Sequence, residues 1–290
     1  MKINKIKLKI GYLLMLIGIF LPLASLTKIA YTDFCSESSY KNFFYNNKDD
    51  TEKVESEIED YNHKVKEKNE KYLIDPFIND KYNAEYDIYR KNPNMIFAYI
   101  LIPKINVKMP IRLGASAKNL DRGAAHLDET SLPTGGIGTR SVIAGHRGWY
   151  KGNMFLHVNK LKKGDKVYIE RNKKRLEYEV VNKEIVMPND WDKLEPEEEK
   201  DILTLLTCDP VITRNPKRLL INCENTDKNF YERKNKNKYN INFTEENKTF
   251  KNETLKSVLF MKYILYFLVI VGWVIEIYIL NKFIKVKNMN

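Results

Sequence analysis

Two long apolar runs near the ends of the chain constrain its fold more than any other feature. Residues 10–27 contain no charged side chain, and residues 263–280 contain only Glu276. A run of about 18 apolar residues is long enough to cross the hydrocarbon core of a bilayer. The sequence therefore predicts transmembrane helices at 10–28 and 259–281, and both ends of the segment between them must then meet the same side of a membrane.

The lysines outside these runs predict the orientation. The flanks 1–28 and 255–290 carry nine of the eleven net positive charges of the chain. Basic residues favour the cytoplasmic side, so the basic N-terminus 1–9 and the basic tail 282–290 are both expected in the cytoplasm. The charge is thus explained by membrane flanks, and no nucleic-acid partner is expected. A cleaved signal peptide is the alternative for the first run, but no small-x-small cleavage site follows it, which favours an uncleaved anchor.

The segment between the runs changes character twice. Residues 29–94 include a charge-dense stretch at 46–71 with apolar residues at helical spacing, which predicts an amphipathic helix, laid against the domain or standing off the membrane. Residues 95–226 contain seven or eight short apolar strands separated by turns, a pattern typical of a closed barrel or sandwich. Residues 227–258 are rich in Asn and Lys and predict a polar tether without core residues.

Three of the expected strands place reactive side chains at their ends. The run from Asp201 ends on Cys208 and is stopped by Asp209 and Pro210, while Arg218 opens the next apolar run. Upstream, another apolar strand ends on His146. A lone cysteine is usually a small core residue, but Cys, His and Arg at three strand ends are the side chains needed for thiol-based acyl transfer.

The sequence Thr-Leu-Leu-Thr-Cys at 204–208, with Arg218 after it and His146 before it, resembles the sortases, the membrane-anchored cysteine transpeptidases of Gram-positive bacteria. The resemblance covers residues 72–224. It implies a mainly β fold, an eight-stranded sortase-type barrel over 95–226 with short helices and two flanking transmembrane helices.

The resemblance also implies the site. Cys208 is the expected nucleophile, and His146 is expected to protonate the leaving amine and deprotonate the incoming one. Arg218 is expected to hold the peptide and stabilise the oxyanion, and a nearby imidazole or guanidinium favours the thiolate. Thr207 is expected to bind the substrate. No Asp or Asn that could orient the histidine is apparent in the sequence.

A second motif, Asp75-Pro76-Phe77, resembles the lid of the pilus-building class C sortases. In that branch the acid faces the catalytic arginine and the aromatic ring covers the cysteine. Asp-Pro is also a common turn signal, which leaves a plain turn as the alternative.

The family implies a substrate and partners. These are pilin or surface proteins with an LPXTG-like sorting signal, cleaved after Thr, and a pilin lysine amine as acceptor, at the plasma membrane of a Gram-positive bacterium. The alternatives are a sortase that anchors proteins to a cell-wall precursor, one that mainly hydrolyses, or a non-catalytic scaffold. Asp209, Cys223 and Glu224 depart from the class C pattern. The three cysteines have no metal-ligand spacing, so no metal or cofactor is expected.

Overall fold

The computed structural model describes residues 2–46, 52–68, 73–78, 86, 88, 94–148, 154–188, 190–209, 217–226, 248 and 250–288. It contains two compact units. One consists of Met1–Cys35 with Lys256–Asn290, and the other of Ser36–Leu255. Most of the expected tether, residues 227–247, lies outside the described residues.

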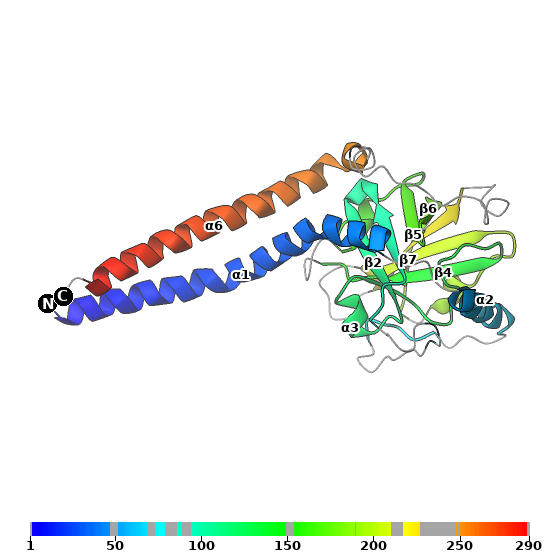
Figure 1. Cartoon of the computed structure of the whole chain (residues 1–290), viewed down its shortest axis with the longest axis horizontal. Helices are drawn as coiled ribbons and strands as arrows, with labels where there is room; N and C mark the ends of the chain where they lie inside the picture. Colours follow the sequence, from blue (N-terminus) through cyan, green and yellow to red (C-terminus); the bar gives the residue numbers. More distant parts are fainter. Residues whose placement is uncertain are drawn as a thin grey trace. The chain divides into compact units, whose positions relative to one another are not determined.

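The unit Ser36–Leu255 is built on a closed barrel, and Figure 1 labels five of its strands. The strand order is β1-β2-β3-β4-β7-β8-β6-β5. The strands are β1 Ala98–Ile102, β2 Val107–Leu113, β3 Ala124–His126, β4 Thr139–Ala144, β5 Lys166–Arg171, β6 Lys174–Val186, β7 Asp201–Asp209 and β8 Lys217–Asn225. The pairs β2–β3 and β4–β7 are parallel, and the other pairs are antiparallel. The predicted mainly β fold with a closed eight-stranded barrel is confirmed.

Strand β7 separates two apolar clusters because successive side chains point to opposite faces of a sheet. Leu203 and Leu205 belong to the large cluster of the barrel core. Leu206 belongs to a second cluster on the other face, together with Leu220 of β8. Cys208 has the same parity as Leu206, so the expected nucleophile lies on the face that carries the second cluster.

Short helices complete this unit. Helix α2, Glu52–Glu67, buries Ile58 and Val65, and Ile58 joins the barrel core cluster. The charge-dense stretch therefore forms a helix that packs against the barrel. The remaining short elements are the helix α3 Ala117–Leu120 and the 3-10 helices η1 Pro103–Ile105, η2 Val158–Lys160 and η3 Trp191–Leu194.

Helix α1, Lys2–Asn46, continues well past the predicted membrane span. Within the barrel unit, its Tyr40 and Phe44 share a cluster with Tyr99 and Leu101 of β1. Phe250 joins the same cluster. The expectation of a tether without core residues is thus wrong at its C-terminal end, because the average polarity of the stretch concealed one aromatic residue that β1 can bury.

The other unit pairs the first part of α1 with α6, Lys256–Asn288. The indole Nε1 of Trp273 donates to Thr27 Oγ1 at 3.0 Å, and Tyr266 donates to Asp33 at 2.5 Å. These contacts make the two helices antiparallel. Both are long and apolar enough to cross a bilayer, which fits the prediction of membrane anchoring.

Candidate active site

The antiparallel pairing of β7 with β8 brings the thiol and the guanidinium to one rim of the barrel. Cys208 and Arg218 are direct cross-strand partners in this register. Cys208 is half-buried, whereas Arg218 is fully buried. Directly opposite residues in a sheet have neighbouring side chains, so the structure brings these two predicted site residues together.

His146 follows β4 by two residues. Ala144 pairs with Leu206, and the N–H of Gly145 donates to the carbonyl of Leu206 at 3.1 Å. The parallel pairing of β4 with β7 therefore continues one residue past the end of β4, towards Cys208. Thr207, predicted to bind substrate, is buried, and its hydroxyl donates to the carbonyl of Gly145 at 2.7 Å. Its hydroxyl therefore ties the end of β7 to the backbone that leads to His146.

The histidine has an acidic neighbour that the sequence did not reveal. His146 Nε2 lies 3.9 Å from Asp121 Oδ1, just after α3. This distance is too long for a hydrogen bond, so the contact places a carboxylate near the imidazole rather than bonded to it. No spacing rule could have predicted it, because 25 residues and two strands separate Asp121 from His146 in the chain.

The motif Asp75-Pro76-Phe77 lies directly over the site. Arg218 Nε donates to Asp75 Oδ2 at 2.8 Å, and both side chains are buried. The other carboxylate oxygen of Asp75 accepts the N–H of Phe77 at 2.9 Å, which is a turn of the kind that Asp commonly forms. The phenyl ring lies 5.3 Å from Arg218 Cζ and 5.8 Å from the centre of the His146 ring. The segment is therefore both a turn and a cover.

The covered thiol has a raised pKa. Burial is the main cause, and the charge of Asp75 raises the pKa of Cys208 further, while Arg218 and Arg147 lower it. The expectation that a neighbouring guanidinium favours the thiolate is confirmed in direction, because Arg218 lowers the pKa of Cys208, but in this closed arrangement desolvation outweighs that effect. Removing the cover would remove the charge of Asp75 and reduce the burial of the thiol, and both changes lower the pKa.

Arg147 is a candidate functional residue that the sequence analysis missed. Its Nη1 donates to the Asp209 carboxylate and lies 3.4 Å from the carbonyl oxygen of Cys208. The side chain is mostly buried, and its charge acts on Cys208. The sequence held only part of this signal, because Arg147 directly follows His146 but its partner Asp209 lies 62 positions further along the chain.

Two other reactive side chains serve the fold. His126 is buried between the Ser131 carbonyl and the Tyr86 hydroxyl, each at 2.9 Å, and burial lowers its pKa to about 4. Cys223 lies in the barrel core, where burial raises the pKa of its thiol. Among the residues that the structure describes, no group of three or more His, Cys, Asp or Glu side chains is arranged to hold a metal ion.

Known proteins match both the sequence and the fold. The sortase domain family matches residues 100–226. Sortase A of Bacillus anthracis is 34% identical over 126 residues, which are 43% of this chain and 58% of that protein. Sortase C-3 of Streptococcus pneumoniae matches with a TM-score of 0.59 and 34% identity, over 66% of this chain and 90% of that structure. Sortase C2 of pilus island 1 from group B Streptococcus matches with a TM-score of 0.53 and 36% identity, over 61% and 98%.

The closed barrel, with a cysteine and an arginine paired at its rim beneath a cover, is the architecture of a β-barrel cysteine transpeptidase. The matched segment spans less than two thirds of the curated sortase A, but most of the two class C structures. The chain therefore belongs to the sortase family. Within that family it resembles the class C members in fold, and the lid motif agrees with this resemblance.

Proposed function

We propose that this protein cleaves an LPXTG-like sorting signal after Thr and transfers the acyl group to a pilin lysine, so that pilins are polymerised. The main support is the rung Cys208–Arg218 on a covered apolar face, with His146 following the adjacent parallel strand. The similarity to class C sortases, one of them described as a pilus-island enzyme, supports the pilus role.

The reaction has two acyl transfers. The Cys208 thiolate attacks the Thr carbonyl carbon, and Arg218 stabilises the oxyanion. His146, as imidazolium, gives its proton to the leaving Gly amine as the C–N bond breaks, which leaves a thioester. The lysine amine then attacks this thioester, His146 takes the amine proton, and the C–S bond breaks to release the Cys208 thiolate.

The lid would hold the enzyme inactive until a substrate arrives. In the closed arrangement the Arg218 guanidinium, which has to bind the peptide, donates to Asp75 instead, and Phe77 lies against His146. A charge-assisted hydrogen bond and a partly buried ring each contribute on the order of 1–3 kcal/mol. Such a lid stays mostly closed and still opens.

The two apolar helices would anchor the protein in the plasma membrane of a Gram-positive bacterium. The lysines near both ends favour a cytoplasmic location for both termini, and the barrel would then face outward. A cysteine introduced at Lys2 should react with a membrane-impermeant maleimide only after cell lysis. Labelling of that cysteine in intact cells would contradict the proposed topology.

The full chain in detergent micelles provides the test of the activity. It is mixed with a peptide that contains Leu-Pro-x-Thr-Gly and with hydroxylamine, and adducts are analysed by mass spectrometry. A thioacyl adduct on Cys208 and a hydroxamate product support the proposal, and Cys208→Ala must abolish both. Absence of both with the unmodified chain would favour the non-catalytic scaffold.

The acceptor distinguishes pilus assembly from cell-wall anchoring. The same thioacyl enzyme is offered either a lysine-containing pilin domain or the amine of a cell-wall precursor. Preferential isopeptide formation on the pilin supports the class C role, and preferential transfer to the precursor would favour the anchoring sortase.

A further inference from the structure

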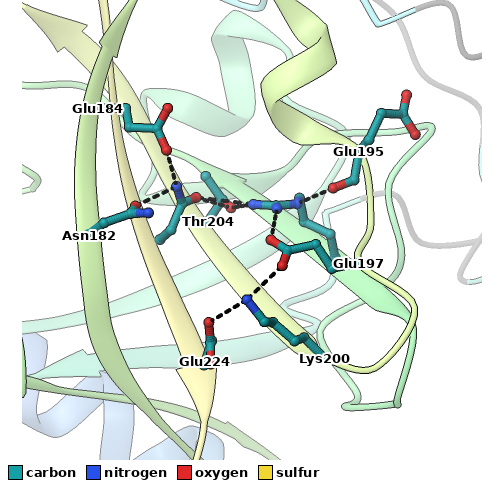
Figure 2. A network of polar contacts seen from close by, with 9 residues as sticks. Asn182, Glu184, Glu195, Glu197, Lys200, Thr204 and Glu224 are labelled. Atoms are coloured by element: carbon teal, nitrogen blue, oxygen red, sulfur yellow. Dashed lines mark hydrogen bonds and ion pairs between the residues drawn. The ribbon is translucent and has the colours of Figure 1, made fainter.

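A buried polar network lies on the same face as the candidate active site, further along the same strands. Thr204 of β7 pairs with Asn222 of β8, and Cys208 pairs with Arg218 in the same ladder. Side chains two and four residues apart share a face, so the polar rung lies about 13 Å from the catalytic rung. Figure 2 draws this network around Thr204.

Arg140, the second residue of β4, is the centre of the network. Its Nη1 donates to Thr204 Oγ1 at 3.0 Å and to Asn222 Oδ1 at 3.1 Å, which ties it to the sheet. Its Nε donates to the backbone carbonyl of Glu195 at 2.7 Å, and its Nη2 to the Glu197 carboxylate at 3.2 Å. The guanidinium thus joins three strands to the connection that follows β6.

The rest of the network keeps these groups in place. Lys200 forms ion pairs with Glu197 at 2.6 Å and with Glu224 at 3.1 Å. Asn222 Nδ2 donates to Asn182 Oδ1 at 2.8 Å and to Glu184 Oε1 at 3.2 Å, both in β6. Figure 2 labels these two acceptors. We call Arg140, Thr204, Asn222, Glu197 and the carbonyl of Glu195 the Arg140 clamp.

An apolar floor lies between the Arg140 clamp and the catalytic rung. It is formed by Val142, Ala144, Leu206 and Leu220, which belong to one buried cluster. Leu194 belongs to the same cluster, and Trp191 packs against it, both from η3 in the connection that the clamp holds.

In the closed arrangement, two residues of the lid segment pack against this floor. Leu73 is a member of the same cluster, and Phe77 packs against it. When the lid opens, the floor would lose these two side chains but keep η3, which is fixed by the Arg140 clamp. What would remain is an apolar surface, here called the apolar site, that begins at Leu206, two residues before Cys208, and is bounded by Leu194 and Trp191.

We infer that Arg140 is a positioning residue that sets the depth of this apolar site and so selects a large aliphatic residue in the sorting peptide. The inference rests on the proposed function. Arg suits this task because its planar guanidinium can bind a backbone carbonyl, a carboxylate and two side chains at once, which a Lys ammonium cannot. A fixed site penalises a small side chain, whereas a loose site does not.

The test compares two peptides that differ only in Leu or Ala at the first position of the signal. The readout is the ratio of their kcat/KM values with the full chain in micelles. This ratio does not depend on how much of the enzyme is folded, so a purely structural role for Arg140 leaves it unchanged. We expect Arg140→Met to lower the ratio roughly fivefold or more, mainly through KM for the Leu peptide.

Glu197→Gln is the second variant and Glu198→Gln the matched control. Glu197 is exposed at the surface, so its replacement keeps the fold even if Arg140→Met does not, and we expect an intermediate ratio. Glu198 is also exposed on the same connection, and its replacement should leave the ratio at the wild-type value. Equal ratios for Glu197→Gln and the wild type would overturn the inference alone, whereas a wild type without any thioacyl adduct would overturn the proposed function.

Discussion

Asp209 follows the expected nucleophile directly, and its carboxylate by itself opposes formation of the Cys208 thiolate. In the structure Arg147 donates to this carboxylate and also lowers the pKa of Cys208. We expect Arg147→Met to raise the pKa of the thiol, because a nearby cation is lost and an uncompensated anion remains. Alkylation of Cys208 at neutral pH should slow about threefold to tenfold.

A double-mutant cycle separates charge from packing. Asp209→Asn alone should speed alkylation, and Arg147→Met with Asp209→Asn should return the rate towards the wild-type value. If the double variant remains as slow as Arg147→Met, the arginine acts through packing and the electrostatic explanation is wrong.

At the residue scale, the sequence alone predicted the pair of site residues that lie close together in the chain. Cys208 and Arg218 were predicted because β7 and β8 form a hairpin, and the structure pairs them. Asp121 and Arg147 were missed because their roles depend on pairings between distant strands. Arg140 was missed for the same reason, since its acceptors lie 55 to 82 positions further along the chain.

The proposed lid is an element whose removal should change both the access of reagents to Cys208 and the protonation of its thiol. Asp75→Ala with Phe77→Ala removes an anion and the cover from Cys208, and both changes lower the pKa of the thiol. The pH profile of alkylation should therefore shift to lower pH, and the rate at neutral pH should rise at least about tenfold if the lid is mostly closed.

Ile78→Ala is the control for the lid, because Ile78 belongs to the same turn but is exposed. Its alkylation profile should match that of the wild type. Identical profiles for the double lid variant and the wild type would rule out a gate at this position.

The packing of helix α2 against the barrel core should contribute to the stability of the barrel unit. Ile58 is buried in the barrel core cluster, so Ile58→Ala should lower the free energy of unfolding by about 2–4 kcal/mol. Asp60→Ala, at an exposed position of the same helix, should change it by less than about 0.5 kcal/mol. Denaturant titration of both variants measures the difference, and equal midpoints would show that α2 does not stabilise the barrel.

Elements were predicted best where the apolar pattern is local. The helical spacing in the charge-dense stretch predicted α2, and the run at 201–208 predicted β7. The strand β3, Ala124–His126, could not be recognised in the sequence, because three residues are too few to show alternation. Its pairing with β2 and β4 comes from tertiary contacts that no local pattern contains.

At the scale of the whole molecule, helix α1, Lys2–Asn46, runs without interruption across the boundary between the two units, which lies between Cys35 and Ser36. Residues 36–46 are therefore part of the barrel unit although they continue a helix of the other. Tyr40 is fully buried and donates to the buried carboxylate of Glu170, which also pairs with Arg175. Lys108 of β2 forms an ion pair with Glu37 at 2.6 Å.

These contacts predict where the barrel unit can be cut. A fragment of residues 36–255 keeps the cluster of Tyr40 and Phe44 with Tyr99, whereas a fragment of residues 47–255 exposes Tyr99 and leaves Glu170 without the Tyr40 hydroxyl. Loss of two buried aromatic side chains and a buried hydrogen bond should lower the melting temperature of the shorter fragment by about 10 °C or more. In the full chain, Tyr40→Ala should be strongly destabilising and Tyr45→Ala, at an exposed position, should not. If both fragments melt at the same temperature, the end of α1 contributes nothing to the barrel and serves only as a connection between the two units.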